Sequence, residues 1–275
     1  LPANQKAGKI DYAKSIFGYS NEKESYRSRV SFSDAVAEAT DLKEEKKYEA
    51  ILAEPKPTSY MDYLQQENGK MPVTYNTDGF KLRGIKQYWL HKDARIEKGN
   101  TDKVNRNLLS TIQPLKEGTK FTGKIRFQNL KEDELGLLLW AVRLEANSWM
   151  NLGKAKAFGF GNVKVKLLEV KKLDIEKAYL TDGALELRPF QTIDADQLID
   201  SYKQKIAAVV GVKEIEDSRW IQSFLEMKDS TRIPEPENVR YMSIKKEYQN
   251  RKSNETKGLN LALPTIEEVL KKTKG

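Results

Sequence analysis

The chain of 275 residues contains no cysteine and only one histidine, His91. Without cysteine it can form neither a disulfide nor a thiolate metal site. A single histidine excludes a histidine-rich zinc site and leaves a Ser-His-Asp triad possible only through His91. The sequence also has no apolar run near the roughly 18 residues that a membrane-spanning helix needs. We therefore expect neither thiol nor zinc chemistry, and no membrane-spanning helix within this sequence.

Positive charge is present but is concentrated in one stretch. The net charge is +8, and residues 81–130 hold twelve Lys and Arg against four Asp and Glu, so the remaining chain is neutral overall. Four aromatic residues lie in the same stretch: Tyr88, Trp89, Phe121 and Phe127. This combination favours a polyanionic partner over a small acid, although an ordinary solvated basic face has the same composition.

The clearest secondary-structure pattern covers residues 119–170. Apolar and basic residues alternate over 121–127, which predicts a strand with one apolar and one basic face. The segment 134–146, ELGLLLWAVRLEA, is apolar nearly all round, which predicts a largely buried helix, and Asn129 is a plausible N-cap for it. Residues 161–170 then close the unit as a strand. A strand, helix and strand of these lengths match the second half of a ferredoxin-like fold.

Weaker patterns flank this unit. A helix is predicted over 10–17, ending at Gly18, and strands are predicted over 27–39 and 80–90. After residue 171 the pattern becomes helical, with three helices expected: 194–210, 217–228 and 264–272. We therefore divide the chain into a portion of mixed structure, residues 1–171, and a helical C-terminal region, residues 172–275.

A glycine-rich loop, GKAKAFGFG, occupies residues 153–161 and is called the glycine loop below. It follows a helix and opens a strand, the reverse of a dinucleotide-binding fingerprint, and Lys154 is followed by Ala155 rather than by the Ser or Thr of a P-loop. Its glycines expose backbone N–H groups that could face a phosphate, and Phe158 or Phe160 could stack on a base. A tight turn with both aromatics in the core is the alternative, and spacing leaves both open.

Catalytic patterns are weak. Asp34, Asp62 and Asp78 lie in or beside expected loops, but no spacing brings any two of them together, so structural or solvated roles are the simpler interpretation. His91 has no obvious carboxylate partner and is more typical of a surface residue than of a catalyst. No G-x-S-x-G nucleophile motif is present.

Six segments, taken in order, resemble a known family. They are AKSIFG (13–18), SRVSFSDA (28–35), EPKPTSYMDYL (54–64), LRGIKQYW (82–89), FTGKIRFQNLKEDELGLLLWAV (121–142) and GKAKAFGFGNVKV (153–165). Together they resemble the RAMP superfamily of CRISPR-associated proteins, most closely the backbone-type RAMP proteins of type III systems. The Phe-Gly motif, the Arg-Val-x-Phe-x-Asp-Ala strand, the Pro-Lys-Pro segment and the glycine loop carry the resemblance, which covers residues 10–168.

The resemblance implies an α+β fold with a ferredoxin-like, RRM-type RAMP core. Family members line up along a CRISPR RNA and hold its backbone while the guide bases pair with target RNA. The matched segments belong to the latter half of such proteins, so we expect another chain or segment to supply the N-terminal half of the core. The expected protein is prokaryotic and cytoplasmic, with no membrane partner. Its expected partners are CRISPR RNA, target RNA and other RAMP subunits of an antiviral effector complex.

The resemblance also implies what activity this chain could have. We expect this chain to act mainly as a scaffold, with no cofactor. Some family members cut the target through a loop aspartate and a divalent metal, so a metal-dependent endoribonuclease using an ion such as Mg²⁺ is one alternative, although no aspartate here is assigned to that role. A general RNA-binding module unrelated to CRISPR is the other alternative.

The candidate RNA-binding residues come from three places. The basic stretch supplies Arg83, Lys86, Lys124 and Arg126, and the strand motif near residue 30 adds Arg27 and Arg29. The glycine loop supplies Lys154, Lys156, Phe158 and Gly159, and the resemblance raises the functional interpretation of this loop above that of a simple turn.

Overall fold

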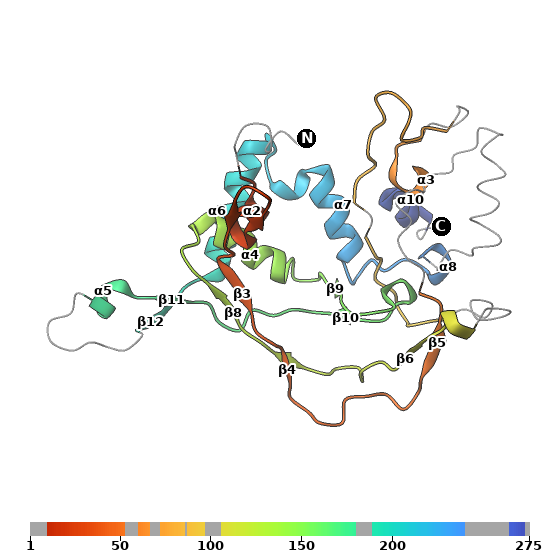
Figure 1. Ribbon diagram of the computed structural model, residues 1–275, viewed down its shortest axis with the longest axis horizontal. Coiled ribbons are helices and arrows are strands. Elements are labelled where there is room, and N and C mark those ends of the chain that lie inside the picture. Colours follow the sequence, from red (N-terminus) through yellow and green to blue (C-terminus); the bar gives the residue numbers. More distant parts are fainter. Residues whose placement is uncertain are drawn as a thin grey trace. The chain divides into compact units, whose positions relative to one another are not determined.

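The computed structural model describes residues 10–52, 60–66, 72–85, 87–96, 106–179, 189–239 and 264–272. It is an α+β structure whose sheets, within these residues, are all two-stranded and antiparallel (Figure 1). The chain forms two compact units. Unit 1 contains Leu1–Leu42, Glu117–Ala146 and Val165–Gln222, and unit 2 contains Lys43–Lys116, Asn147–Lys164 and Ser223–Gly275. The domain boundary expected between residues 171 and 172 stays a prediction.

Unit 1 combines short antiparallel strand pairs with helices. Its strands are β1 (Tyr19–Ser20), β2 (Ser25–Tyr26), β3 (Val30–Phe32), β4 (Val36–Ala37), β7 (Phe121–Thr122), β8 (Ile125–Phe127), β11 (Lys171–Leu173) and β12 (Phe190–Thr192). Its helices are α2 (Tyr12–Phe17), α4 (Glu132–Arg143), α5 (Ile175–Tyr179), α6 (Ala195–Val210) and a 3-10 helix at Ile215–Asp217. Helix α7 (Arg219–Lys228) begins in the range of unit 1 and ends in that of unit 2.

One core of unit 1 lies beneath the pair formed by β3 and β8, called the β3–β8 ribbon below. Val30 faces Phe127 and Phe32 faces Ile125 across the ribbon. Val30 packs with Ile16 of α2 and Leu138 of α4 in a buried cluster, to which Ile125 and Phe127 add partly buried surface. Burial of such side chains gives about 1.5–3 kcal/mol each relative to exposure, so this cluster holds α2, the ribbon and α4 together.

Helices α4 and α6 approach one another closely because α4 carries a glycine at the crossing. A Cβ atom on Gly136 would stand 2.3 Å from the carbonyl oxygen of Leu198, so no larger residue fits there. The rings of Trp140 and Tyr202 then meet with centroids 6.1 Å apart. Lys203 of α6 adds ion pairs to Glu145 at 2.7 Å and Glu216 at 2.5 Å.

Unit 2 is built around a smaller core. Its strands are β5 (Tyr48–Ala50), β6 (Ser110–Ile112), β9 (Met150–Asn151) and β10 (Asn162–Val163). Its helices are α3 (Tyr60–Tyr63), α8 (Pro236–Val239), α10 (Ile266–Lys272) and two 3-10 helices, Arg106–Leu108 and Lys156–Phe158. The pair β5–β6 contributes Ala50 and Ile112 to a buried cluster with Ala155, Phe158 and Phe160. The glycine loop is therefore part of this core.

The predicted helices are confirmed and the predicted strands are shorter than expected. Helix α2 ends at Gly18, α4 buries Leu135, Leu138 and Trp140, and α6, α7 and α10 occupy the three expected C-terminal positions. Within the described residues of 80–90, Leu82 forms only an isolated bridge with Leu64. No helix in the described part of the chain is long and apolar enough to cross a membrane.

Candidate nucleic-acid interface

The β3–β8 ribbon carries basic side chains on the face opposite its core. Arg126 lies across from Ser31, and both side chains are exposed, whereas their neighbours Val30 and Phe127 point to the core. Lys124 precedes β8 and is also exposed, and its backbone N–H donates to Ser33 Oγ at 2.8 Å. Neither basic side chain has an ion pair within the described residues. The predicted alternation therefore places two uncompensated cations on one solvent-facing surface.

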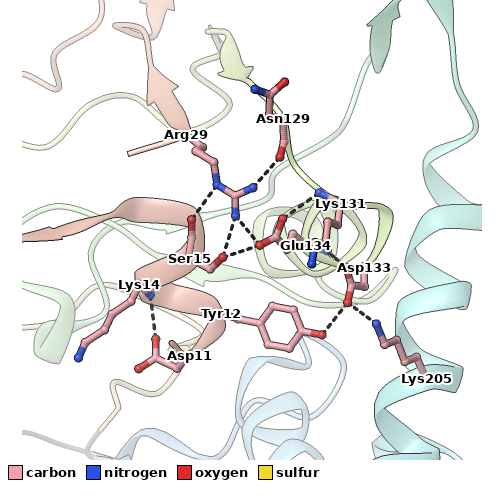
Figure 2. A network of polar contacts seen from close by, with 10 residues as sticks. All are labelled: Asp11, Tyr12, Lys14, Ser15, Arg29, Asn129, Lys131, Asp133, Glu134 and Lys205. Atoms are coloured by element: carbon pink, nitrogen blue, oxygen red, sulfur yellow. Dashed lines mark hydrogen bonds and ion pairs between the residues drawn. The ribbon is translucent and has the colours of Figure 1, made fainter. Parts of the chain in front are cut away.

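Arg29, another sequence candidate, is engaged inside unit 1 (Figure 2). Its Nε donates to the Ser15 carbonyl at 2.9 Å, one Nη donates to the Asn129 carbonyl at 2.6 Å, and the other donates to Ser15 Oγ at 2.8 Å and to the Glu134 carboxylate. These contacts join α2, the strand β3 and the start of α4. The structure thus gives Arg29 a structural role, and its RNA-binding role stays a prediction.

The carboxylates of this network have perturbed pKa values. Burial acts to raise the pKa of Glu134, but hydrogen bonds from Arg29, Ser15 and the Lys131 backbone outweigh it, and the net pKa lies below the usual value. At the adjacent Asp133, burial is likewise outweighed by hydrogen bonds from Lys205 and Tyr12, which lower its pKa (Figure 2). Both carboxylates are therefore held in their charged form at the start of α4, where they also complement the helix dipole.

The backbone of the glycine loop is fixed by left-handed residues and by its neighbour, residues 91–95. A short 3-10 helix, Lys156–Phe158, has Ala155 (φ 59°) before it and Gly159 (φ 86°) after it, both left-handed. The Arg95 N–H donates to the Phe158 carbonyl at 2.8 Å. A Cβ atom on Gly159 would stand 2.7 Å from the Asp93 carbonyl oxygen and 2.8 Å from His91 Cβ. Gly159 is thus required by both conformation and packing.

The side chains of the glycine loop divide between core and solvent. Phe158 is only 2% exposed and Phe160 is also buried, so both rings are covered by protein in this structure. This burial favours the turn-and-core interpretation of the two aromatics, and stacking of Phe158 on a base stays a prediction. Lys154 is exposed, and Lys156 is half-buried, with Nζ 2.6 Å from the Gly153 carbonyl and 5.4 Å from the Tyr88 ring centre.

A buried lysine that sequence analysis missed supports the segment beside this loop. Lys228, at the end of α7, is 3% exposed and donates from Nζ to the Tyr88 carbonyl at 2.8 Å and to Asn151 Oδ1 at 2.6 Å. Asn151 in turn donates to Asn162 Oδ1 at 3.2 Å, and Asn162 donates to the His91 carbonyl at 2.9 Å. Burial lowers the pKa of Lys228 to about 8. No sequence pattern marks this residue, because a lysine at a helix end is ordinarily solvated.

The other sequence candidates are dispersed. Arg27 is exposed beside β2, and Arg83 is half-buried, with its backbone N–H donating to the Tyr63 carbonyl at 2.8 Å. Lys86 lies outside the described residues. His91 is half-buried rather than on the surface, and burial lowers its pKa. Within the described ranges no three His, Asp or Glu side chains, including those of Asp34, Asp62 and Asp78, gather so that they could hold a metal ion.

Comparison with known proteins supports the family resemblance that the sequence motifs indicate. No curated protein matches the chain. The family model of the RAMP superfamily matches residues 2–164, which is more than half of the chain and includes both the β3–β8 ribbon and the glycine loop. The chain therefore belongs to the RAMP superfamily of CRISPR-associated proteins.

Proposed function

We propose that this chain is a backbone subunit of a type III CRISPR effector complex, in which it binds the CRISPR RNA that recognises target RNA. Membership of the RAMP superfamily points to a CRISPR-associated, RNA-binding role. The observation that carries the proposal is the exposed pair Lys124 and Arg126 on a strand ribbon inside the family-matched segment. Cations without carboxylate partners are suited to phosphates, which position RNA without reading its sequence.

The glycine loop supports the same function in a smaller way. Lys154 is exposed beside Gly153, where a side chain would meet nothing within 4 Å, so a nucleic-acid backbone could approach closely. Its two phenylalanines, Phe158 and Phe160, pack in the core of unit 2 and hold the loop in place. In this proposal the loop contributes charge and backbone N–H groups, and the core of unit 2 holds them in position.

The proposal includes the assembly expected from the sequence. In a ferredoxin-like core, which is a split β-α-β arrangement, the β3–β8 ribbon would be part of a wider sheet, and a strand of the N-terminal half would lie between β8 and the strand after α4. In the described residues β8 pairs only with β3, and β10 pairs with β9. Two-stranded ribbons are marginal by themselves. A further chain or segment, supplying the N-terminal half of the core, would extend this sheet, and other RAMP subunits would be its neighbours.

Removing the basic pair tests RNA binding directly. We expect Lys124→Ala with Arg126→Ala to weaken binding of single-stranded RNA and to reduce the slope of log affinity against log salt by about 1.4, at roughly 0.7 per lost phosphate contact. The measurement is a salt titration by fluorescence anisotropy. The matched control is Lys171→Ala with Lys172→Ala, which removes equal charge from the exposed lysines of β11. Wild-type affinity and slope in a folded Lys124/Arg126 variant would contradict the proposal.

A further inference from the structure

We infer that unit 1 carries a base-stacking site formed by Phe17 and Phe32, at which unpaired RNA bases extend an existing aromatic stack. The inference rests on the proposed RNA-binding function and names a contact of a different kind from the phosphate contacts above. The two rings are nearly parallel, with centroids 6.4 Å apart and planes 20° apart. Phe17 is 48% exposed and Phe32 is 58% exposed, so the stack is open to solvent.

A second stacked pair lies next to the first in the chain. Tyr19 and Tyr26 face one another across β1 and β2, with centroids 6.2 Å apart and planes 25° apart, and Tyr26 is also exposed. Lys14 lies 5.6 Å from the centre of the Tyr19 ring. The Glu24 carboxylate interacts with the same Tyr19 side chain. Proteins that bind single-stranded nucleic acid commonly combine exposed aromatic rings with cations, because every base offers a flat face on which a ring can stack.

The backbone around these rings is held firmly, so the site is preorganised. Phe17 ends α2, and Gly18 follows so close to β2 that an added Cβ would stand 2.2 Å from the Tyr26 carbonyl oxygen. The Arg29 N–H donates to the Ile16 carbonyl at 3.0 Å, and the Arg29 side chain fixes the same turn of α2. An aromatic platform that is already ordered loses little conformational freedom when a base stacks on it.

Charge identifies nucleic acid as the occupant of this surface. The segments 25–33 and 118–131, which contain β2, β3, β7 and β8, carry six Lys and Arg and no Asp or Glu, and within the described part of the chain only Arg29 of the six is paired with a carboxylate, that of Glu134. Lys124 and Arg126 lie on the opposite face of the ribbon, because Phe32 shares the face of Val30 and of its partner Ile125. On the side of the rings, Lys14 stands three residues before Phe17 on α2, and the exposed Arg27 follows Tyr26. Exposed rings with cations alongside suit a base and its phosphate together. An apolar protein surface would gain nothing from these cations.

The test separates stacking from simple apolar contact. Phe17→Leu with Phe32→Leu keeps apolar side chains of similar size but removes the rings. We expect this variant to bind a fluorescent oligouridine about five- to a hundredfold more weakly than wild type, with an unchanged salt slope. On an abasic ribose-phosphate oligomer, which offers phosphates and no bases, wild type and variant should bind equally. Phe17→Tyr with Phe32→Tyr should retain wild-type affinity for oligouridine.

An exposed phenylalanine outside the stack provides the control. Phe190→Leu, on the exposed strand β12, should leave the affinity for oligouridine unchanged. A thermal melt checks folding, and Phe32→Leu alone replaces the double variant if that variant unfolds. Wild-type affinity in the leucine variant would overturn the stacking site, as would equal weakening on the abasic oligomer, and a protein partner would then be the better occupant. Failure of wild type to bind any RNA would overturn the proposed function as well.

Discussion

Replacing Glu134 with alanine is expected to lower the free energy of unfolding by about 3–5 kcal/mol, the usual consequence of leaving one member of a buried ion pair without its partner. Glu134 is buried and accepts hydrogen bonds from Ser15 Oγ at 2.5 Å and from the Lys131 N–H at 2.8 Å, in addition to its ion pair with Arg29. The variant leaves the Arg29 guanidinium in the protein without a carboxylate. Chemical denaturation at neutral pH measures the loss.

The effect of Glu134 should depend on pH in a defined direction. Its pKa in the folded chain is below the ordinary 4.5, so its contribution to stability is fully present above pH 4.5 and is lost as the pH falls through the folded-state value. The stability difference between wild type and Glu134→Gln should therefore shrink below pH 4.5. Glu132→Ala removes an exposed carboxylate from the same helix turn and should change stability by less than about 1 kcal/mol. A Glu134→Ala loss as small as this control would contradict the assignment.

Gly159→Ala is the second change with a large expected effect. The substitution places a side chain on a left-handed residue and drives a Cβ atom against the Asp93 carbonyl oxygen and the His91 side chain. Together these effects should lower the free energy of unfolding by about 2–4 kcal/mol. The loop core containing Phe158 should loosen with it, so the melting temperature and the affinity for RNA should fall together. Thermal and chemical denaturation, with RNA affinity on the same samples, make the measurement.

Replacing the two lysines of the glycine loop should have the opposite pattern of effects: weaker RNA binding with little loss of stability. Lys154→Ala with Lys156→Ala removes charge from exposed or half-buried positions, which carry little folding free energy. We expect a nearly normal melt but weaker binding to each of two unrelated guide RNAs, because phosphate contacts do not depend on base sequence. If affinity for both guides stays at the wild-type level, the loop is a structural turn only.

Sequence patterns predicted the helices well because their signals are local. Gly18 and Gly211 end α2 and α6, Asp11 and Asp194 cap the same two helices, and the apolar residues of α4 mark it as buried. Boundaries were less certain: Asn129 was predicted as the N-cap of α4, but Lys131 occupies that position. Asn129 instead has a positive φ of 52° and offers its carbonyl to Arg29, a tertiary contact that no local pattern contains.

The exposed residues of the candidate site could be predicted from the alternation of side chains along a strand. The residues that are buried by contacts with distant segments could not. Strand alternation correctly placed Arg126 on the exposed face of β8 and Lys124, which directly precedes β8, in an exposed position. The same reasoning could not show that Arg29 meets Glu134, a residue 105 positions away in the chain. Nor could it show that Lys228 is buried, since its acceptors, Tyr88 and Asn151, come from distant segments.

Sequencing the RNA that co-purifies with this chain from cells carrying its CRISPR locus tests the central claim most directly. The account predicts one class of RNA, with a common repeat-derived tag joined to different guide sequences. It also predicts that Lys124→Ala with Arg126→Ala reduces the amount recovered, whereas Lys171→Ala with Lys172→Ala does not. A mixture of cellular RNAs without a common tag, or no RNA at all, would contradict a role in binding CRISPR RNA.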